Sequence, residues 1–212
     1  MRDDGARMGP FKGNLMMPRI LVFAGSTRTG AYSGKTADAA MKELGLQGAE
    51  VTRISLADYP LPIMNQDLER EKGIPVNAIK LAHMIGAHDA LLIATPEYNG
   101  SIPPLLKNTI DWVSRVKADA HGRPFRAFNG KLIALCSSSD GMYAGIRAIN
   151  HLRAILVQCQ AEVIASQCSV PRAAEAFDEN GDFREERLKK AMTKVCSSLL
   201  EHARLFSTRV EP

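Results

Sequence analysis

The amino-acid sequence predicts a three-layer α/β domain, in which helices cover both faces of a parallel sheet of five strands. The chain has 212 residues, which suits one ordinary domain with a sizeable core. Apolar residues make up 45% and charged residues 24%, a balance typical of globular proteins. Short apolar β runs alternate with longer helical patterns, as they do in successive β/α units.

The first strand is expected at residues 19–24, RILVFA, because a continuous apolar run is typical of a strand buried on both faces. A turn-rich stretch at 25–34 then leads into a helix at 35–44. The second strand is expected at 50–54, and a loop that contains prolines follows it at 58–67.

Pro75 can begin the next helix, since the first helical position needs no N–H donor. We expect that helix to place Ile79, Ala82, His83 and Gly86 along one side. The later strands are expected at 89–94, 132–137 and 162–168, and the later helices at 105–112, 143–159 and 183–206. Residues 1–18 are expected to form a flexible tail, and residues 19–212 a single domain.

The composition disfavours several functional classes. No apolar run approaches the roughly 18 residues of a membrane span, and residues 1–17 lack the apolar core of a secretory signal, so we expect a cytoplasmic protein without membrane contact. The net charge is +4, with Lys and Arg spread along the chain, which disfavours nucleic-acid binding. The four cysteines form no C-x-x-C pair and the histidines show no ligand spacing, so no metal site is expected.

Ligands of open parallel sheets bind at the carboxyl ends of the strands. After the first strand the chain reads GSTRTGAYSGKT, residues 25–36, which gathers glycines, hydroxyls and cations before a helix. Unpaired N–H groups and the helix dipole favour an anion there, so we expect a phosphate site that includes Arg28. A helix capped by Ser or Thr is the alternative.

Other known nucleotide-binding and catalytic motifs match this loop less well. The dinucleotide fingerprint G-x-G-x-x-G and the nucleophile elbow G-x-S-x-G are absent. Gly34, Lys35 and Thr36 imitate the end of a P-loop, but Thr29 stands where that motif needs its first glycine. A degenerate P-loop protein therefore stays as an alternative.

The loop after the third strand, residues 95–104, reads TPEYNGSIPP. Its backbone groups and the aromatic wall of Tyr98 suit the edge of a planar polar heterocycle, and Gly100 permits close backbone approach. Its prolines start a helix whose Leu, Ile and Trp side chains form a core face.

Together these segments resemble the NADPH-dependent FMN reductase family, a flavodoxin-like group that includes quinone, azo-dye and chromate reductases. Residues 96–112, PEYNGSIPPLLKNTIDW, carry the most specific likeness. The first loop is similar to the family pattern G-S-x-R-x-G-S-x-N, although Ala31 and Ser33 replace its second Ser and its Asn. Residues 137–147 correspond to the family's Ser- and Gly-rich loop. The resemblance covers about residues 19–206 and implies a flavodoxin-like sandwich with strand order 2-1-3-4-5.

The resemblance also implies FMN as cofactor and NAD(P)H as electron donor, with no catalytic side chain and no metal. The residues implied to hold the FMN phosphate are Ser26, Arg28 and Ser33. The residues implied to surround its ribityl chain and ring are Pro96, Glu97, Tyr98, Asn99 and Gly100, with Ser137, Ser139 and Gly141 nearby.

The implied activity is the reduction of a quinone, flavin or similar small-molecule acceptor by NAD(P)H through FMN, in a ping-pong order. Relatives of this kind are homodimers or homotetramers, so the resemblance implies the same here. The main alternative is an electron carrier or redox sensor without turnover. Flavodoxin carriers are usually acidic, whereas this chain carries a net charge of +4, which disfavours the carrier.

Overall fold

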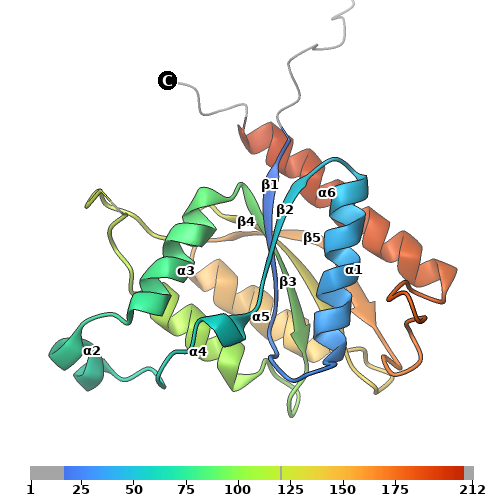
Figure 1. Ribbon diagram of the computed structural model, residues 1–212, viewed down its shortest axis with the longest axis horizontal. Helices are drawn as coiled ribbons and strands as arrows, with labels where there is room; N and C mark the ends of the chain where they lie inside the picture. The colour runs from blue at the N-terminus through green and yellow to red at the C-terminus, as the bar shows by residue number, and fades with distance from the viewer. Residues whose placement is uncertain (1–16, 120, 208–212) are drawn as a thin grey trace, which may run out of the picture.

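The computed structural model describes residues 17–119 and 121–207, which form a three-layer α/β sandwich (Figure 1). Its five parallel strands lie in the order β2-β1-β3-β4-β5, as predicted. The strands are β1 (Arg19–Ala24), β2 (Glu50–Ile54), β3 (Ala90–Pro96), β4 (Leu132–Ser138) and β5 (Glu162–Val170). The α-helices are α1 (Tyr32–Leu46), α2 (Gln66–Lys72), α3 (Val76–Ala87), α4 (Pro104–Val113), α5 (Ile146–Gln158) and α6 (Glu186–Ser207), and a short 3-10 helix spans Leu56–Asp58. Of the predicted tail, residues 1–16 lie outside the described part.

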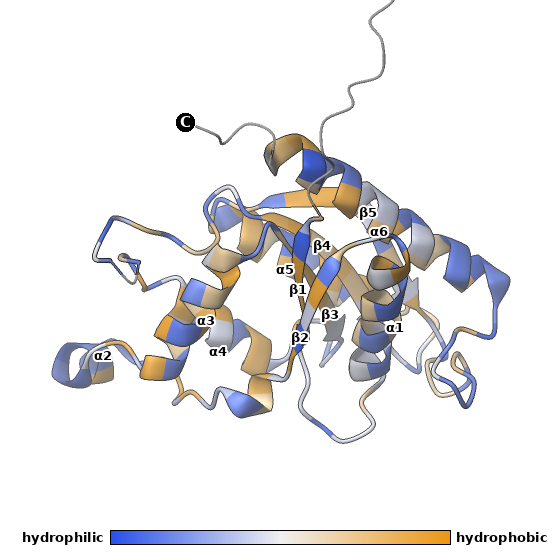
Figure 2. Ribbon diagram, turned by 45° about the horizontal axis from the view of Figure 1, so that its top comes forward, coloured by the Kyte–Doolittle hydropathy of each residue, from blue (hydrophilic) through white to orange (hydrophobic). Residues whose placement is uncertain are grey.

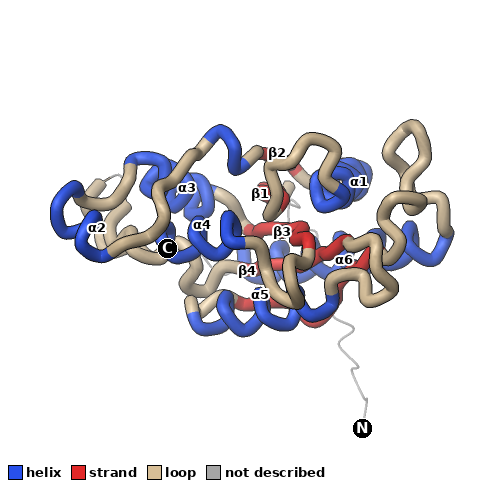
Figure 3. The backbone as a smooth tube through the Cα atoms, turned by 90° about the horizontal axis from the view of Figure 1, so that it is seen from below, coloured by secondary structure: helices blue, strands red, loops and turns tan. Residues whose placement is uncertain are grey.

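The helices form two layers around the sheet, and each layer has its own apolar core (Figure 3). Alternate strand residues such as Val22 and Leu92 pack with α1 and α6 on one face. Their neighbours, such as Leu21 and Leu91, pack with α3, α4 and α5 on the other face. Because β1 and β3 are covered on both sides, they read in the sequence as continuous apolar runs rather than as alternating ones.

Two helices differ from their sequence predictions. Helix α2 was not predicted, because none of its residues is buried and it has no apolar stripe to detect; Figure 2 shows it as largely hydrophilic. In α3 the buried residues are Ala78, Leu81, Ala82 and Ile85, so the predicted side was wrong by about one position. Gly86 is exposed, yet a Cβ there would come within 2.8 Å of the Phe125 ring.

The segment before α2 is held by polar residues of α4. The Asn108 side chain accepts a hydrogen bond from Met64 N at 2.8 Å and donates one to Pro62 O at 2.9 Å. Trp112, which is fully buried, donates from Nε1 to Pro62 O at 2.8 Å. These two residues of the 96–112 motif therefore shape a neighbouring loop, while Leu106 and Ile110 supply the predicted core face.

The edge strand β5 contains a register shift opposite Ile133 and Leu135 of β4. The Arg153 guanidinium, from α5, donates to Val163 O at 3.2 Å and to Ile164 O at 2.8 Å. The irregular part of the strand thus gains hydrogen-bond donors from the helix that covers it.

Three of the four thiols lie in the core between the sheet and α6, at Cys136, Cys168 and Cys196. Burial raises the pKa of all three, that of Cys168 to about 12. Cys159, at the end of α5, is half-buried, and burial raises its pKa as well. A raised pKa lowers the thiolate fraction at neutral pH; the three core thiols are also shielded from reagents by their burial, whereas Cys159 is partly accessible.

Candidate functional site

The loops that follow β1, β3 and β4 lie together at the carboxyl edge of the sheet, which faces the viewer in Figure 3. The N-terminus of α1 lies in the first of them. Its N-cap residue is Ala31, no side chain caps it, and its first turn contains no acidic residue. The alternative of a Ser or Thr cap is therefore wrong for this helix, and its first N–H groups are left for an anion.

Ser33, in this first turn, has a hydroxyl that is fully buried and has no hydrogen-bond partner within the described residues. A buried polar group without a partner is costly, so its presence calls for an explanation. A phosphate at the helix N-terminus would supply one. Residues 27–30, which precede the helix, are exposed.

The other two residues implied for the phosphate lie in the same loop. Ser26 Oγ accepts a hydrogen bond from Arg28 N at 3.3 Å, which leaves its own O–H free to donate. Arg28 is exposed, and its guanidinium lies 5.8 Å from the centroid of the Tyr32 ring. These contacts are weak enough to be exchanged for an anion, so the loop fits a phosphate.

The P-loop interpretation fails on two of the three residues that suggested it, Lys35 and Thr36. Lys35 points to the Phe177 ring, with Nζ at 6.0 Å from its centroid. Thr36 is fully buried and donates from Oγ1 to Tyr32 O at 2.9 Å. Neither side chain reaches the loop as a phosphate-binding Lys or a metal-binding Thr would.

After β3 the chain forms a tight turn with Asn99 and Gly100 at its centre. Tyr98 and Ser101 exchange two backbone hydrogen bonds, of 2.9 and 3.0 Å. The central residues have φ of +50° and +79°, as a type I′ turn requires, and glycine is well suited to the second position. The Asn99 and Gly100 N–H groups make no hydrogen bond within the described residues, and Tyr98 is 46% exposed.

Glu97, implied to surround the flavin, and Ser137, implied to lie near it, are both turned into the protein. The Glu97 side chain is only 7% exposed and faces α5, where it pairs with Arg147. Ser137 is fully buried, and its hydroxyl donates to Ala144 O at 2.6 Å. Because their polar atoms are used by the fold, the structure places neither side chain on the open surface.

The loop after β4 is anchored to the segment that follows β5. Ser139 Oγ accepts from Gly141 N at 3.2 Å, and Asp140 Oδ1 accepts from Ala174 N at 3.0 Å. Met142 and Tyr143 are exposed beyond these contacts. Ser139 and Gly141 therefore lie at the rim of the carboxyl edge, and their contact with FMN stays a prediction.

Ser138, the last residue of β4, also lies at this edge and was not among the residues predicted for the site. Its hydroxyl is buried and lacks a partner among the described residues, as that of Ser33 does. Alternation along β4 places Ser138 on the same face as Cys136, the face that α1 and α6 cover. The run of three serines could have indicated this burial. Because side chains alternate along a strand, Ser138 must point away from the side on which Ser137 and Ser139 lie.

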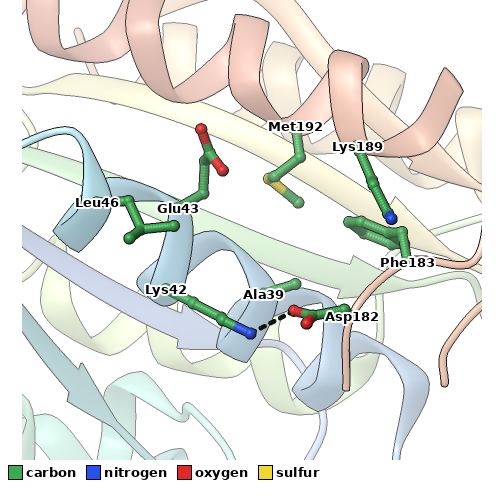
Figure 4. A pocket seen from close by; sticks show the side chains of 8 residues that line it. All are labelled: Ala39, Lys42, Glu43, Leu46, Asp182, Phe183, Lys189 and Met192. Atoms are coloured by element: carbon green, nitrogen blue, oxygen red, sulfur yellow. Dashed lines mark hydrogen bonds and ion pairs between the residues drawn. The ribbon is translucent and has the colours of Figure 1, made fainter. Parts of the chain in front are cut away.

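A cavity of about 250 Å³ lies elsewhere, between α1 and α6 (Figure 4). Lys42 Nζ and Asp182 Oδ1 are 2.6 Å apart at its side. None of the residues implied for FMN lines it. In the described part of the chain, no helix has the length and apolarity of a membrane span, and no three His, Cys, Asp or Glu side chains are grouped as metal ligands.

The strand order, with helices on both faces of the sheet, defines a flavodoxin-like protein, and the uncapped start of α1 lies at the carboxyl edge of that sheet. The sequence profile described as NADPH-dependent FMN reductase matches residues 18–175. The chain belongs to this family, whose members are oxidoreductases that use FMN with NAD(P)H.

The relatives agree with this assignment. A quinone reductase of Escherichia coli (strain K12) is 36% identical over 147 residues, which cover 69% of this chain and 73% of the relative. An NAD(P)H-dependent FMN reductase of Pseudomonas aeruginosa is 33% identical over 184 residues, or 85% and 92% of the two chains. Among solved structures, the flavoenzyme FerB of Paracoccus denitrificans has a TM-score of 0.73 at 23% identity, covering 89% of this chain and 98% of that one, which shows a shared fold.

Proposed function

We propose that this chain is an NAD(P)H-dependent FMN reductase that passes hydride to a quinone, a free flavin or a similar small-molecule acceptor. The observation that carries the proposal is the uncapped N-terminus of α1 with the unpartnered, buried hydroxyl of Ser33, at the edge of the sheet where ligands bind. When bound, FMN supplies the hydride chemistry, while the protein supplies binding and orientation.

The phosphate would be held by the first N–H groups of α1 with Ser26, Arg28 and Ser33. The ring would lie on the turn after β3, with Tyr98 beside it and the Asn99 and Gly100 N–H groups as donors to its polar edge. Those two N–H groups have no partner within the described part of the protein. Donors held in advance toward a site of developing negative charge stabilise that charge without reorganisation.

The electron donor and the acceptor would use the same exposed surface in turn, because one open ring face has room for one planar partner. Each product must then leave before the next substrate enters, which is ping-pong order. We also expect a homodimer or homotetramer, which light scattering after size exclusion would test.

The visible absorption spectrum of the purified protein, before and after addition of FMN, tests cofactor binding. Steady NAD(P)H oxidation with a quinone present, with parallel double-reciprocal plots at several quinone concentrations, would support the reductase. Intersecting plots would contradict the ping-pong order. Flavin binding without turnover would favour the electron carrier, and no flavin binding would overturn the proposal.

A further inference from the structure

Glu97 is a buried charged residue beside an exposed turn. One of its oxygens, Oε1, accepts from Arg147 Nε at 2.7 Å and also contacts the Nη2 atom of that guanidinium. The other, Oε2, accepts from Ala148 N at 3.4 Å. Both oxygens are therefore used by the first turn of α5, which compensates the burial of the charge.

The far end of the same turn is attached to the same helix. Ser101 Oγ lies 3.0 Å from His151 Nδ1. Because Arg147 and His151 are four residues apart on α5, they share one face of that helix. The turn after β3 is thus fixed to this face at both ends, by Glu97 before it and by Ser101 after it.

The start of α5 also lies close against β4 and Glu97. A Cβ on Gly145 would lie 2.9 Å from Ser137 Cβ and 3.7 Å from Glu97 Cβ. The guanidinium of Arg147 lies 5.2 Å from the centroid of the exposed Tyr143 ring. The loop after β3 and the loop after β4 are consequently joined through Glu97 and the first turn of α5.

We propose that Glu97 is a positioning residue: with Arg147 and His151, it holds the turn from Tyr98 to Ser101 in the shape that receives the flavin ring, and its carboxylate makes no flavin contact. This inference rests on the proposed function for its ligand. If α5 no longer held the turn, flavin binding would have to order it, and the affinity for FMN would fall.

The test compares Glu97→Gln, Arg147→Met and their double variant. Arg187→Met is the matched control, because Arg187 forms an exposed ion pair with Glu185 at the start of α6. Hydrogen exchange of the Tyr98 and Ser101 amides, whose hydrogen bonds close the turn, is measured without flavin. FMN affinity and the visible circular dichroism of bound FMN are measured next.

We expect both single variants to speed amide exchange in the turn and to weaken FMN binding about tenfold, the cost of ordering one or two side chains. The double variant should resemble either single one, because both remove the same link. The visible circular dichroism of bound FMN should change alike in the two single variants. The Arg187→Met control should leave amide exchange, FMN affinity and circular dichroism unchanged. Ser101→Ala, which removes the second attachment, should also speed exchange of the turn amides.

If Glu97→Gln weakens FMN binding while Arg147→Met leaves both affinity and exchange unchanged, Glu97 contacts the ligand and the inference is wrong. Unchanged exchange in both variants would overturn it as well. If the wild-type protein binds no FMN, the proposed function fails, whereas the exchange measurement still decides whether Glu97 holds the turn.

Discussion

Gly145 begins α5 with a left-handed backbone, and its replacement by alanine should destabilise the protein in two separable ways. Its φ is +78°, a conformation that costs an L-residue about 1–2 kcal/mol. The new Cβ would also lie 2.9 Å from Ser137 Cβ and 3.2 Å from Ser137 Oγ, closer than atoms in a packed core approach. Overpacking of this kind costs about 1–3 kcal/mol more.

Gly48→Ala is the matched control for this change. Gly48 has φ of +82° between α1 and β2, and nothing lies within 4 Å of a Cβ built on it. It therefore shares the conformational cost and lacks the steric one. Urea unfolding at constant slope should show Gly145→Ala to be less stable than Gly48→Ala by about 1–3 kcal/mol.

The steric part can be checked by a double-mutant cycle. In a Ser137→Gly background the clashing atoms are gone, so Gly145→Ala should cost less there than in the wild type. Equal losses for Gly145→Ala and Gly48→Ala, together with additivity in the Ser137→Gly background, would refute the close approach of α5 to β4.

Three further experiments test other parts of the structure. Arg28→Ala should weaken FMN binding by about 1.5–3 kcal/mol if Arg28 makes a charge-assisted bond to the phosphate, and riboflavin, which lacks that phosphate, should bind equally to variant and wild type in fluorescence titrations. One thiol per native chain, that of Cys159, should react with a disulfide reagent, against four in denaturant; rapid reaction of a second native thiol would contradict the burial of the other three. Hydrogen bonds from the Arg123 backbone, and then from its side chain and from His121 N, lower the pKa of Asp119 to about 2, so its stabilising contribution is present above pH 4 and is lost as pH falls toward 2. An NMR titration of Asp119 with a midpoint near 4 would refute that.

The sequence was sufficient for the sheet and for its carboxyl edge, because buried strands and the loops that follow them have strong local signals. The strand at 19–24 is an example, because five consecutive apolar residues follow Arg19 and all five are buried. The start of α1 was predicted three residues late, since Ser33 and Gly34 resemble cap and turn residues, whereas the actual N-cap residue, Ala31, has no capping side chain.

The orientation of Glu97 and of Ser137 could not be predicted from the sequence. Glu97 follows β3, and Ser137 lies near the end of β4. Polar residues at the carboxyl edge of a parallel sheet commonly face a ligand. Glu97 instead accepts hydrogen bonds from Arg147 and Ala148 in the first turn of α5, about 50 residues further along the chain. Ser137 donates a hydrogen bond to the carbonyl of Ala144, in the segment that leads into α5. The pairing of Glu97 across 50 residues depends on tertiary contacts that local patterns do not contain, and the contact of Ser137 depends on how the seven residues up to Ala144 fold back.

The register shift in β5 has a consequence for the behaviour of the protein at high concentration. β5 is the outermost strand on its side of the sheet, and a regular edge strand would offer its free carbonyls and amides to another chain. Here the carbonyls of Val163 and Ile164 are already occupied by Arg153, and the irregular backbone does not match a straight incoming strand. The register shift therefore makes this edge a poorer template for pairing with another chain.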